Sequence, residues 1–318
     1  MYRNQKIALV IPAYNEQKLI RSTLENIPAL IDVVYVVDDK SPDGQNAVIL
    51  DCAARDARIQ LIRHEANQGP GGAIITGYLR ASREDAAIAV VVGADFQMPL
   101  DEVTRFLDPI IDGQVDYTKG NRFMLSKLAH TLETMPRIRL VGNWLITALT
   151  KIASGYYKIM DVVDGYTAIS RRAIDSIDWS KAWTRYGYPM DFLIRLNAHA
   201  FKVRDIPRTA IYLKGERQSQ IKGLDYALKV APMLVRGFFW RLKFKYLFLD
   251  FHPLVFFYYL AFILLPSGLL YGCYLVVDRV FFGGYGVTAS RAVLDALMLI
   301  SGSQFFLFAM FFDMEEGK

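Results

Sequence analysis

The segment that decides the fold runs Ile7-Ala-Leu-Val-Ile11 and continues into the polar stretch Pro12-Ala-Tyr-Asn-Glu16. Its first five residues are aliphatic, as in a buried strand, and the proline ends the run. Three further short apolar runs, 33–37, 59–62 and 88–92, follow with helical patterns between them. This alternation predicts an α/β domain with a mostly parallel, Rossmann-like sheet that is covered by helices on both faces.

Polar residues follow three of these four strands. Tyr14 and Glu16 come after the first strand, Asp38 and Asp39 after the second, and Asp95 after the fourth. Ligands of parallel sheets bind beyond the carboxyl ends of the strands, where carboxylates can accept hydrogen bonds from a nucleobase and from ribose hydroxyls. The same residue types are also common as helix caps and in turns, so both interpretations stay open at this point.

Asp95 and Gln97 stand two residues apart after the fourth strand. On extended backbone their side chains would point to the same side. A carboxylate and an amide oxygen placed in this way could ligate Mg²⁺ or Mn²⁺ that bridges a diphosphate. The stretch Asn67-Gln-Gly-Pro-Gly-Gly-Ala73 opens a helix and could approach an anion, but it fits neither the dinucleotide nor the P-loop spacing.

The last quarter of the chain is membrane-like. Leu254 to Val277 contains no charged side chain, and at about 1.5 Å per residue this run is long enough to cross a hydrocarbon core of about 30 Å. A second apolar run gives another span at about 292–312. The short segment 278–291 connects the two spans, which therefore predict a helical hairpin over 251–318. Such a hairpin returns the C-terminus to the side where the hairpin begins.

A basic segment, 222–250, precedes the first span. Its cations alternate with apolar residues, which is typical of a helix lying on anionic headgroups, although a solvated charged helix has a similar pattern. The positive-inside rule then places residues 1–221 in the cytoplasm, at the plasma membrane of a prokaryote or the cytosolic face of the ER. The cations of the segment are Lys222, Lys229, Arg236, Arg241, Lys243 and Lys245.

Charge and cysteine content narrow the class of protein. The net charge of +5 is concentrated beside the spans, and no nucleic-acid motif accompanies it, so we expect a membrane surface and no nucleic acid as partner. The first apolar run is too short for a signal peptide. Cys52 and Cys273 imply no disulfide framework, which agrees with a reducing compartment. The oligomeric state stays open, and a homo-oligomer is compatible with the sequence.

Four motifs resemble family 2 glycosyltransferases, most closely the branch that contains dolichyl-phosphate mannosyltransferases and polyprenyl-phosphate glycosyltransferases. They occur in order as Pro12-Ala-Tyr-Asn-Glu16, Val36-Val-Asp-Asp-Lys-Ser-Pro-Asp-Gly44, Ala94-Asp-Phe-Gln-Met-Pro99 and Asp161 through Tyr166. The resemblance implies a GT-A fold, a UDP- or GDP-sugar donor, Mg²⁺ or Mn²⁺, inversion at the anomeric carbon and a polyprenyl phosphate acceptor in the bilayer.

The resemblance also implies roles for individual residues. Asp95 and Gln97 match the metal and diphosphate positions, and Asp191 falls where the superfamily often carries an acidic catalytic residue. The nucleoside-binding positions are matched by Pro12, Tyr14, Glu16 and Asp39, with Asp38 beside them and Asp95 after the fourth strand. The loops that handle the acceptor phosphate are matched by Arg122, Arg137, Arg217, Ser219 and Lys222.

The chain departs from the family pattern in two places. Gly93 occupies the first acidic position of the Asp-x-Asp motif, which removes one metal or ribose contact. The Gln-x-x-Arg-Trp signature of processive polysaccharide synthases is missing, which disfavours a polymer-forming enzyme. Two other functions fit the sequence less well: transfer to a hydroxyl of a lipid-linked saccharide or glycolipid, and a non-catalytic membrane protein that binds a nucleotide sugar.

Overall fold

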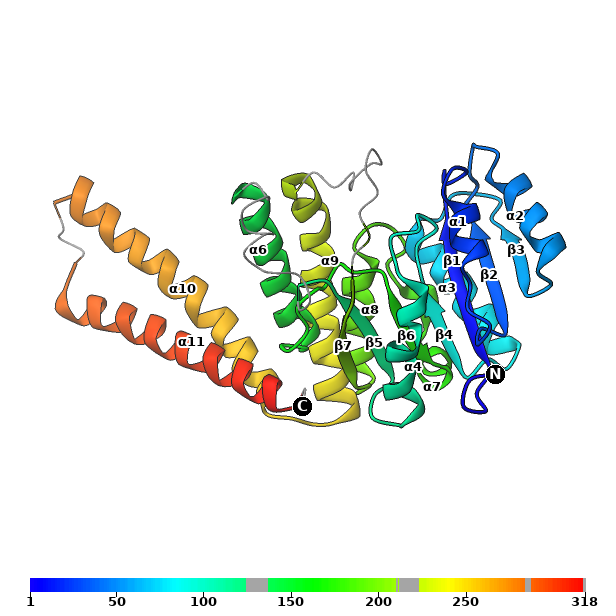
Figure 1. Cartoon of the computed structure of the whole chain (residues 1–318). Coiled ribbons are helices and arrows are strands. Elements are labelled where there is room, and N and C mark those ends of the chain that lie inside the picture. The colour runs from blue at the N-terminus through cyan, green and yellow to red at the C-terminus, as the bar shows by residue number, and fades with distance from the viewer. Residues whose placement is uncertain (124–136, 210, 212–222, 284–286, 317–318) are drawn as a thin grey trace. The chain divides into compact units, whose positions relative to one another are not determined.

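The computed structural model has two compact units, Met1–Phe238 and Phe239–Lys318 (Figure 1). The predicted domain boundary near residue 222 falls outside the part of the chain that the structure describes, so that division stays a prediction. The described residues are 1–123, 137–209, 211, 223–283 and 287–316.

A seven-stranded sheet forms the centre of the first unit, with the strand order β3-β2-β1-β4-β6-β5-β7 (Figure 1). The pairs β1–β2, β2–β3, β1–β4 and β5–β7 are parallel, whereas β6 runs antiparallel to β4 and β5. The predicted mostly parallel sheet is therefore confirmed. The strands are β1 (Ile7–Ala13), β2 (Val33–Asp38), β3 (Ile59–Arg63), β4 (Ile88–Val91), β5 (Tyr117–Asn121), β6 (Thr167–Ser170) and β7 (Val203–Pro207).

Alternate residues of β1 face two different helical layers. Leu9 lies in a core that includes side chains of α1, α2 and α4. Its neighbour Val10 packs against Gly77 of α3, where a Cβ atom would overlap the Val10 side chain. Helices therefore cover both faces of the sheet, as the sequence predicts. The described helices up to residue 243 are α1 (Ile20–Glu25), α2 (Gln45–Arg55), α3 (Pro70–Arg83), η1 (Leu100–Glu102), α4 (Val103–Ile111), α6 (Arg137–Ser154), α7 (Arg171–Ser176), η2 (Trp179–Lys181), α8 (Tyr188–Ala198) and α9 (Gly223–Lys243).

The second unit is a pair of long apolar helices, α10 (Leu254–Phe281) and α11 (Ala289–Glu316), preceded by the π-helical turn η3 (Phe244–Leu249). By length and composition both helices can cross a membrane. They pack closely because small residues face large ones: a Cβ atom on Gly268 would lie 2.8 Å from Leu299, and one on Gly302 would lie 2.9 Å from Leu265. The two predicted candidate spans are confirmed.

A buried ion pair joins the two ends of this hairpin. The guanidinium of Arg241, just before η3, donates two hydrogen bonds of 2.8 and 2.7 Å to Asp313 near the end of α11. The Tyr246 hydroxyl donates to the same carboxylate at 2.7 Å. The pair is inaccessible to solvent. Because Arg241 precedes α10 and Asp313 lies in the last turn of α11, the chain returns to the end of the hairpin where it began.

This arrangement corrects the interpretation of two cations in the basic segment. Arg241 is buried against Asp313, and Lys245 is also buried, so neither side chain is free to lie on lipid headgroups. Lys229, Arg236 and Lys243 are exposed, as a headgroup-binding segment requires. Lys222 lies outside the described residues.

We expect the full chain to remain in the membrane fraction after washing with high salt and with alkaline carbonate, because two apolar helices bury far more hydrocarbon surface than a basic helix at the interface. The matched control is a variant in which Lys229, Arg236 and Lys243 are all changed to Gln. It should be retained equally, as measured by immunoblotting of pellet and supernatant. Release of either protein by carbonate would show that the helices do not span the bilayer.

Candidate functional site

Most of the predicted site residues of the described chain lie at one edge of the sheet. The parallel strands β1, β2, β4, β5 and β7 direct their carboxyl ends to this edge. Because β6 is antiparallel, its amino end, preceded by Asp161 and Asp164, lies there too. The loops that carry Asp39, Asp95 and Arg122 are thus on the same edge as the loop before β6.

Asp38 and Asp39 are buried, and both carboxylates accept hydrogen bonds from the chain itself. Asp38 accepts from Ser41 N at 2.9 Å, from Gln45 Nε2 at 2.7 Å and from Asn46 Nδ2 at 2.9 Å. These contacts tie the turn after β2 to the start of α2. In this structure Asp38 therefore organises a loop, while Tyr14 is exposed at the same edge and Pro12 and Glu16 are half-buried.

Asp39 holds the glycine-rich segment before α3. Its carboxylate accepts hydrogen bonds from the backbone N–H groups of Gln68 and Gly69, both at 2.8 Å. His64 Nδ1 lies 2.8 Å from Asp39 Oδ1, and His64 Nε2 lies 2.9 Å from Thr76 Oγ1. No motif in the sequence points to His64, and these two contacts place it where it orients Asp39.

The expectation that the glycine-rich segment approaches an anion is wrong. The N–H groups of Gly71 and Gly72 donate to the Thr184 carbonyl at 2.8 and 3.3 Å, so the first turn of α3 is capped by the chain. A Cβ atom on Gly71 would lie 2.7 Å from Tyr188 and one on Gly69 would lie 2.6 Å from Thr184 O. The glycines therefore allow the segment before α8 to pack against α3, and a phosphate would find these donors occupied.

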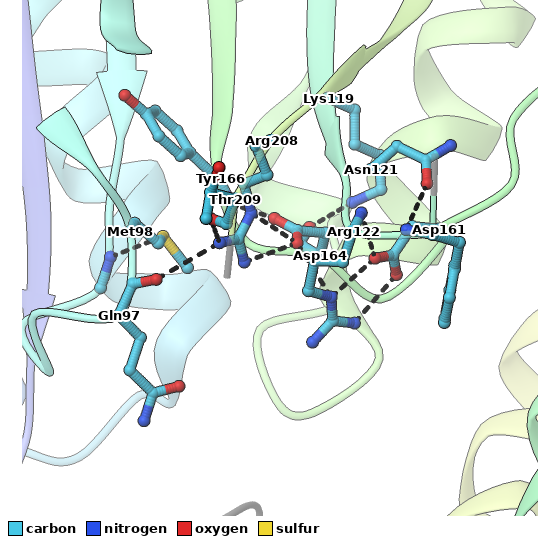
Figure 2. Close-up of polar contacts among 12 residues, drawn as sticks. Gln97, Met98, Lys119, Asn121, Arg122, Asp161, Asp164, Tyr166, Arg208 and Thr209 are labelled. Carbon is cyan, nitrogen blue, oxygen red and sulfur yellow. Dashed lines mark hydrogen bonds and ion pairs between the residues drawn. The ribbon is translucent and has the colours of Figure 1, made fainter. Parts of the chain in front are cut away.

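The backbone from Ala94 to Phe96 is a turn, so the extended geometry expected between Asp95 and Gln97 is wrong. Phe96 has φ +56°, and the Gln97 N–H donates to Asp95 Oδ1 at 3.2 Å. Figure 2 shows the Gln97 side chain directed away from the neighbouring charged cluster, whereas the backbone carbonyl of Gln97 faces Arg208. Asp95 and Gln97 therefore lie in one tight turn and not on an extended strand, so the reason to expect their side chains on the same side no longer applies.

Burial raises the pKa of the Asp95 carboxyl above its ordinary value. A divalent cation would stabilise the ionised form of such a group. No three His, Cys, Asp or Glu side chains gather into a metal cluster among the residues that the structure describes. One carboxylate nevertheless fits Mg²⁺ or Mn²⁺ that takes its remaining ligands from water and from a diphosphate.

Gly93 has a steric as well as a chemical consequence for this turn. A Cβ atom there would lie 2.8 Å from Asp95 Oδ1, closer than real Cβ contacts, so the Asp95 carboxylate occupies space that any larger residue at 93 would claim. The Gly93 N–H donates to Met98 Sδ at 3.2 Å. The missing first acid of the motif thus leaves room for Asp95 to fold back over the turn.

A cluster of alternating charges lies beside the turn (Figure 2). Arg208, which follows β7, is almost fully buried and pairs with Asp164 through Nε at 2.9 Å and Nη2 at 2.7 Å. Arg122, which follows β5, pairs with Asp161 through Nε at 2.7 Å and Nη2 at 3.0 Å. The free-energy cost of burying these charges is offset by pairing, since each arginine has a carboxylate partner.

Lys119 and Asp205 complete the interior of this cluster. Lys119 donates to the Asp164 carbonyl, and burial lowers the pKa of its ammonium group. Asp205 accepts from Asn121 Nδ2 at 2.7 Å, and burial raises the pKa of its carboxyl. Lys119, Asp205 and Arg208 were not predicted. Arg208 follows the short segment Val203-Arg-Asp-Ile-Pro207, whose two charged residues hide its strand character in the sequence.

Asp191 is in the first turn of α8, buried and paired with Arg195 at 2.7 Å. The same oxygen accepts from the Trp183 N–H at 2.9 Å, and Arg195 also donates to the Asp178 and Lys181 carbonyls. Nearly every residue of α8 is buried, so Asp191 lies in a helix that is covered on almost all sides. These contacts indicate that Asp191 holds the segment before α8.

The remaining predicted residues cannot be placed in the site. Arg137 begins α6, but its side chain is not among those that the structure describes. Arg217, Ser219 and Lys222 lie outside the described residues. Their assignment to the acceptor phosphate stays a prediction.

The doubly covered sheet, with acidic and basic loops gathered at one edge, defines a GT-A glycosyltransferase fold. The chain belongs to glycosyl transferase family 2, whose family model matches residues 8–178. The resemblance noted from the motifs is therefore confirmed, and so is the assignment as an enzyme of this class.

Two relatives illustrate the similarity. The UDP-N-acetylglucosamine–dolichyl-phosphate N-acetylglucosaminyltransferase of Methanococcus voltae is 30% identical over 65% of this chain and 86% of its own length. The polyprenol monophosphomannose synthase of Mycolicibacterium smegmatis is 28% identical over 64% of this chain and 77% of its own length.

Solved structures support the fold. Glucosyl-3-phosphoglycerate synthase from Mycobacterium tuberculosis, crystallised with Mg²⁺ and UDP, superposes with a TM-score of 0.53 at 16% identity, covering 75% of this chain and 79% of that one. The same enzyme was also crystallised with Mn²⁺, UDP and glucosyl-3-phosphoglycerate. At this level of identity the likeness extends to the fold alone.

We expect Asp191→Asn and Arg195→Lys to lower the thermal stability of the enzyme in a similar way, because each weakens the same buried ion pair, which costs about 3 kcal/mol when one partner is lost. The activity of both variants should keep the wild-type pH profile. Thermal unfolding and initial rates between pH 5 and 9 measure the two effects. Loss of an acid limb in Asp191→Asn, but not in Arg195→Lys, would instead identify Asp191 as a general base.

Proposed function

We propose that this enzyme transfers a sugar from a UDP- or GDP-sugar to a polyprenyl phosphate in the bilayer, with inversion at the anomeric carbon. The observation that carries the proposal is the combination of a family 2 catalytic unit with two helices able to span a membrane. The names of the two relatives, a dolichyl-phosphate N-acetylglucosaminyltransferase and a polyprenol monophosphomannose synthase, support it. The catalytic unit faces the cytoplasm, where nucleotide sugars are made.

The donor nucleoside binds at the ends of β1 and β2 in this proposal. Pro12, Tyr14 and Glu16 line the nucleoside, and the exposed Tyr14 ring offers a surface for a base to stack on. Asp38 and Asp39 contribute by fixing the loops that frame this position, through the hydrogen bonds described above.

The diphosphate lies at the turn after β4. Asp95, with Gln97 beside it, would hold Mg²⁺ or Mn²⁺, and the ion would neutralise the charge that develops on the departing nucleoside diphosphate. The chain's own contribution is to hold Asp95 in a fixed turn, because the Gln97 N–H and the absence of a side chain at Gly93 set the orientation of its carboxylate.

The acceptor phosphate supplies the nucleophile. A phosphate monoester has a second pKa of about 6 and already carries an anionic oxygen at pH 7, so it needs no general base to attack the anomeric carbon. This requirement fits Asp191, which is paired with Arg195. A sugar hydroxyl would need a base, which makes transfer to a lipid-linked saccharide the weaker proposal.

Basic side chains position the acceptor. Arg122, half-exposed at the end of β5, would donate charge-assisted hydrogen bonds to the acceptor phosphate. Arg137, Arg217, Ser219 and Lys222 would complete this site. The hairpin keeps the catalytic unit at the bilayer, which lowers the entropic cost of meeting a lipid acceptor.

A donor screen tests the proposal. We expect detergent-purified enzyme to release nucleoside diphosphate from one UDP- or GDP-sugar only when polyprenyl phosphate is present, and not with polyprenol, which lacks the anionic nucleophile. Coupled detection of UDP and GDP measures the release. Equal release with polyprenol, or none with any donor, would contradict the proposed acceptor or the proposed activity.

Asp95→Asn should lower kcat/KM by at least about 100-fold, because it removes the buried charge that holds the cation and the effect of lost electrostatic stabilisation is commonly of this size. The matched control is Asp101→Asn, since Asp101 is an exposed acid in η1 close in sequence. It should change the rate less than about threefold. Full activity of the wild type in excess EDTA would overturn the metal assignment.

A further inference from the structure

One carboxylate oxygen is shared by two arginines at the edge of the sheet. Asp164 Oδ2 lies 2.9 Å from Arg208 Nε and 2.7 Å from Arg208 Nη2. The same oxygen lies 3.2 Å from Arg122 Nε. Asp164 Oδ1 accepts from the Tyr166 N–H at 2.8 Å. The Asp164 side chain is 0% exposed, so its charge is balanced by these neighbours and not by solvent.

The two arginines contact different parts of the site (Figure 2). Arg208 donates through Nη1 to the Gln97 carbonyl at 3.3 Å and to the Thr209 carbonyl at 3.0 Å. The same Gln97 residue donates its N–H to Asp95. Arg208 is therefore bonded to the turn that would hold the donor diphosphate.

Arg122 differs from Arg208 in its access to solvent. Its side chain is 31% exposed, against 4% for Arg208, so an anion from solution can reach Arg122 far more easily. Its contact with Asp164 at 3.2 Å is longer than its contact with Asp161 at 2.7 Å. An arriving phosphate competes for the guanidinium N–H groups, and of these two contacts the longer one, to Asp164, is the first to be given up.

If the contact between Arg122 and Asp164 is lost, Arg208 is the one arginine of the pair that still neutralises the Asp164 charge. The Arg208–Asp164 pair is then tighter, because in a buried setting a carboxylate shared between two cations binds each less strongly than a carboxylate held by one. A more firmly held Arg208 fixes the Gln97 carbonyl and with it the turn that carries Asp95. Ordering a binding loop in advance reduces the entropic cost of the next ligand.

We propose that Asp164 couples the two substrates, so that a phosphate at Arg122 strengthens binding of the metal–nucleotide at the Asp95 turn. Asp164 and Arg208 are positioning residues in this account, since neither contacts the reacting atoms. The proposal rests on the proposed function, because it takes Arg122 as the acceptor contact. By linkage, the nucleotide strengthens phosphate binding by the same factor.

The test measures the dissociation constant of nucleoside diphosphate with Mn²⁺ by calorimetry on the full chain in detergent, with and without saturating geranyl phosphate. UDP and GDP are both used, and geraniol, which lacks the phosphate, serves as the ligand control. We expect geranyl phosphate to tighten nucleotide binding at least about fivefold, within the usual range of coupling between sites, and geraniol to have no effect.

Two variants and one control assign the coupling to its residues. Asp164→Asn removes the shared charge, and Arg208→Lys keeps the charge but loses the planar fork that reaches both Asp164 and Gln97. In each variant the tightening should fall below about twofold. The control is Asp116→Asn, which removes a buried carboxylate paired with Arg172 at 2.6 Å just before β5, at the opposite edge of the sheet. It should keep the wild-type coupling.

Two outcomes would overturn the proposal. One is a wild-type enzyme that transfers sugar to polyprenyl phosphate but binds nucleotide equally with and without geranyl phosphate. The other is coupling that persists in Arg208→Lys, which remains informative if Asp164→Asn fails to fold. A wild type that neither binds nucleotide nor transfers sugar would instead refute the proposed function, so the two failures are distinguishable.

Discussion

β6 runs against the direction of its neighbours β4 and β5, and this reversal sets the composition of the site. A parallel strand in the same position would carry Asp161 and Asp164 to the far edge of the sheet. As it is, these two acids enter the edge where β5 and β7 end, and they meet the arginines that follow those strands. This topology therefore brings the buried charges into pairs. Arg208 connects them to the turn after β4 through its hydrogen bond to the Gln97 backbone carbonyl.

Two kinds of side chain lie at this site: buried carboxylates that hold loops in place, and exposed groups that ligands can reach. Asp38, Asp39 and Asp191 all have donors from the chain, and each fixes a loop. Tyr14 and Arg122 retain exposed surface. Buried carboxylates with several hydrogen bonds are rigid because leaving a donor or acceptor unpaired in the interior is costly. Rigid loops of this kind would hold the exposed groups in place for the donor and the acceptor.

The parts of the fold that follow from local pattern could be predicted. The first four strands, the edge at which they end and the two apolar helices are visible as periodicity and length. The direction of β6 is not, since it is set by pairing with distant strands. Nor could the sequence show that Thr184 caps α3, that Phe96 turns at φ +56°, or that Arg241 pairs with Asp313, because each depends on residues far apart in the chain or on one backbone torsion. Motif resemblance drew attention to Asp39 and Asp191, but only the contacts indicate that they position loops.

The chemistry proposed for this enzyme is the conversion of a lipid phosphate monoester into a sugar phosphodiester. Phosphorus-31 NMR of polyprenyl phosphate during turnover observes that conversion at the reacting group. We expect the monoester signal to fall and a phosphodiester signal to rise in proportion to the nucleoside diphosphate released. Consumption of the nucleotide sugar with an unchanged monoester signal would contradict the proposed chemistry, because the sugar would then have gone to a different acceptor.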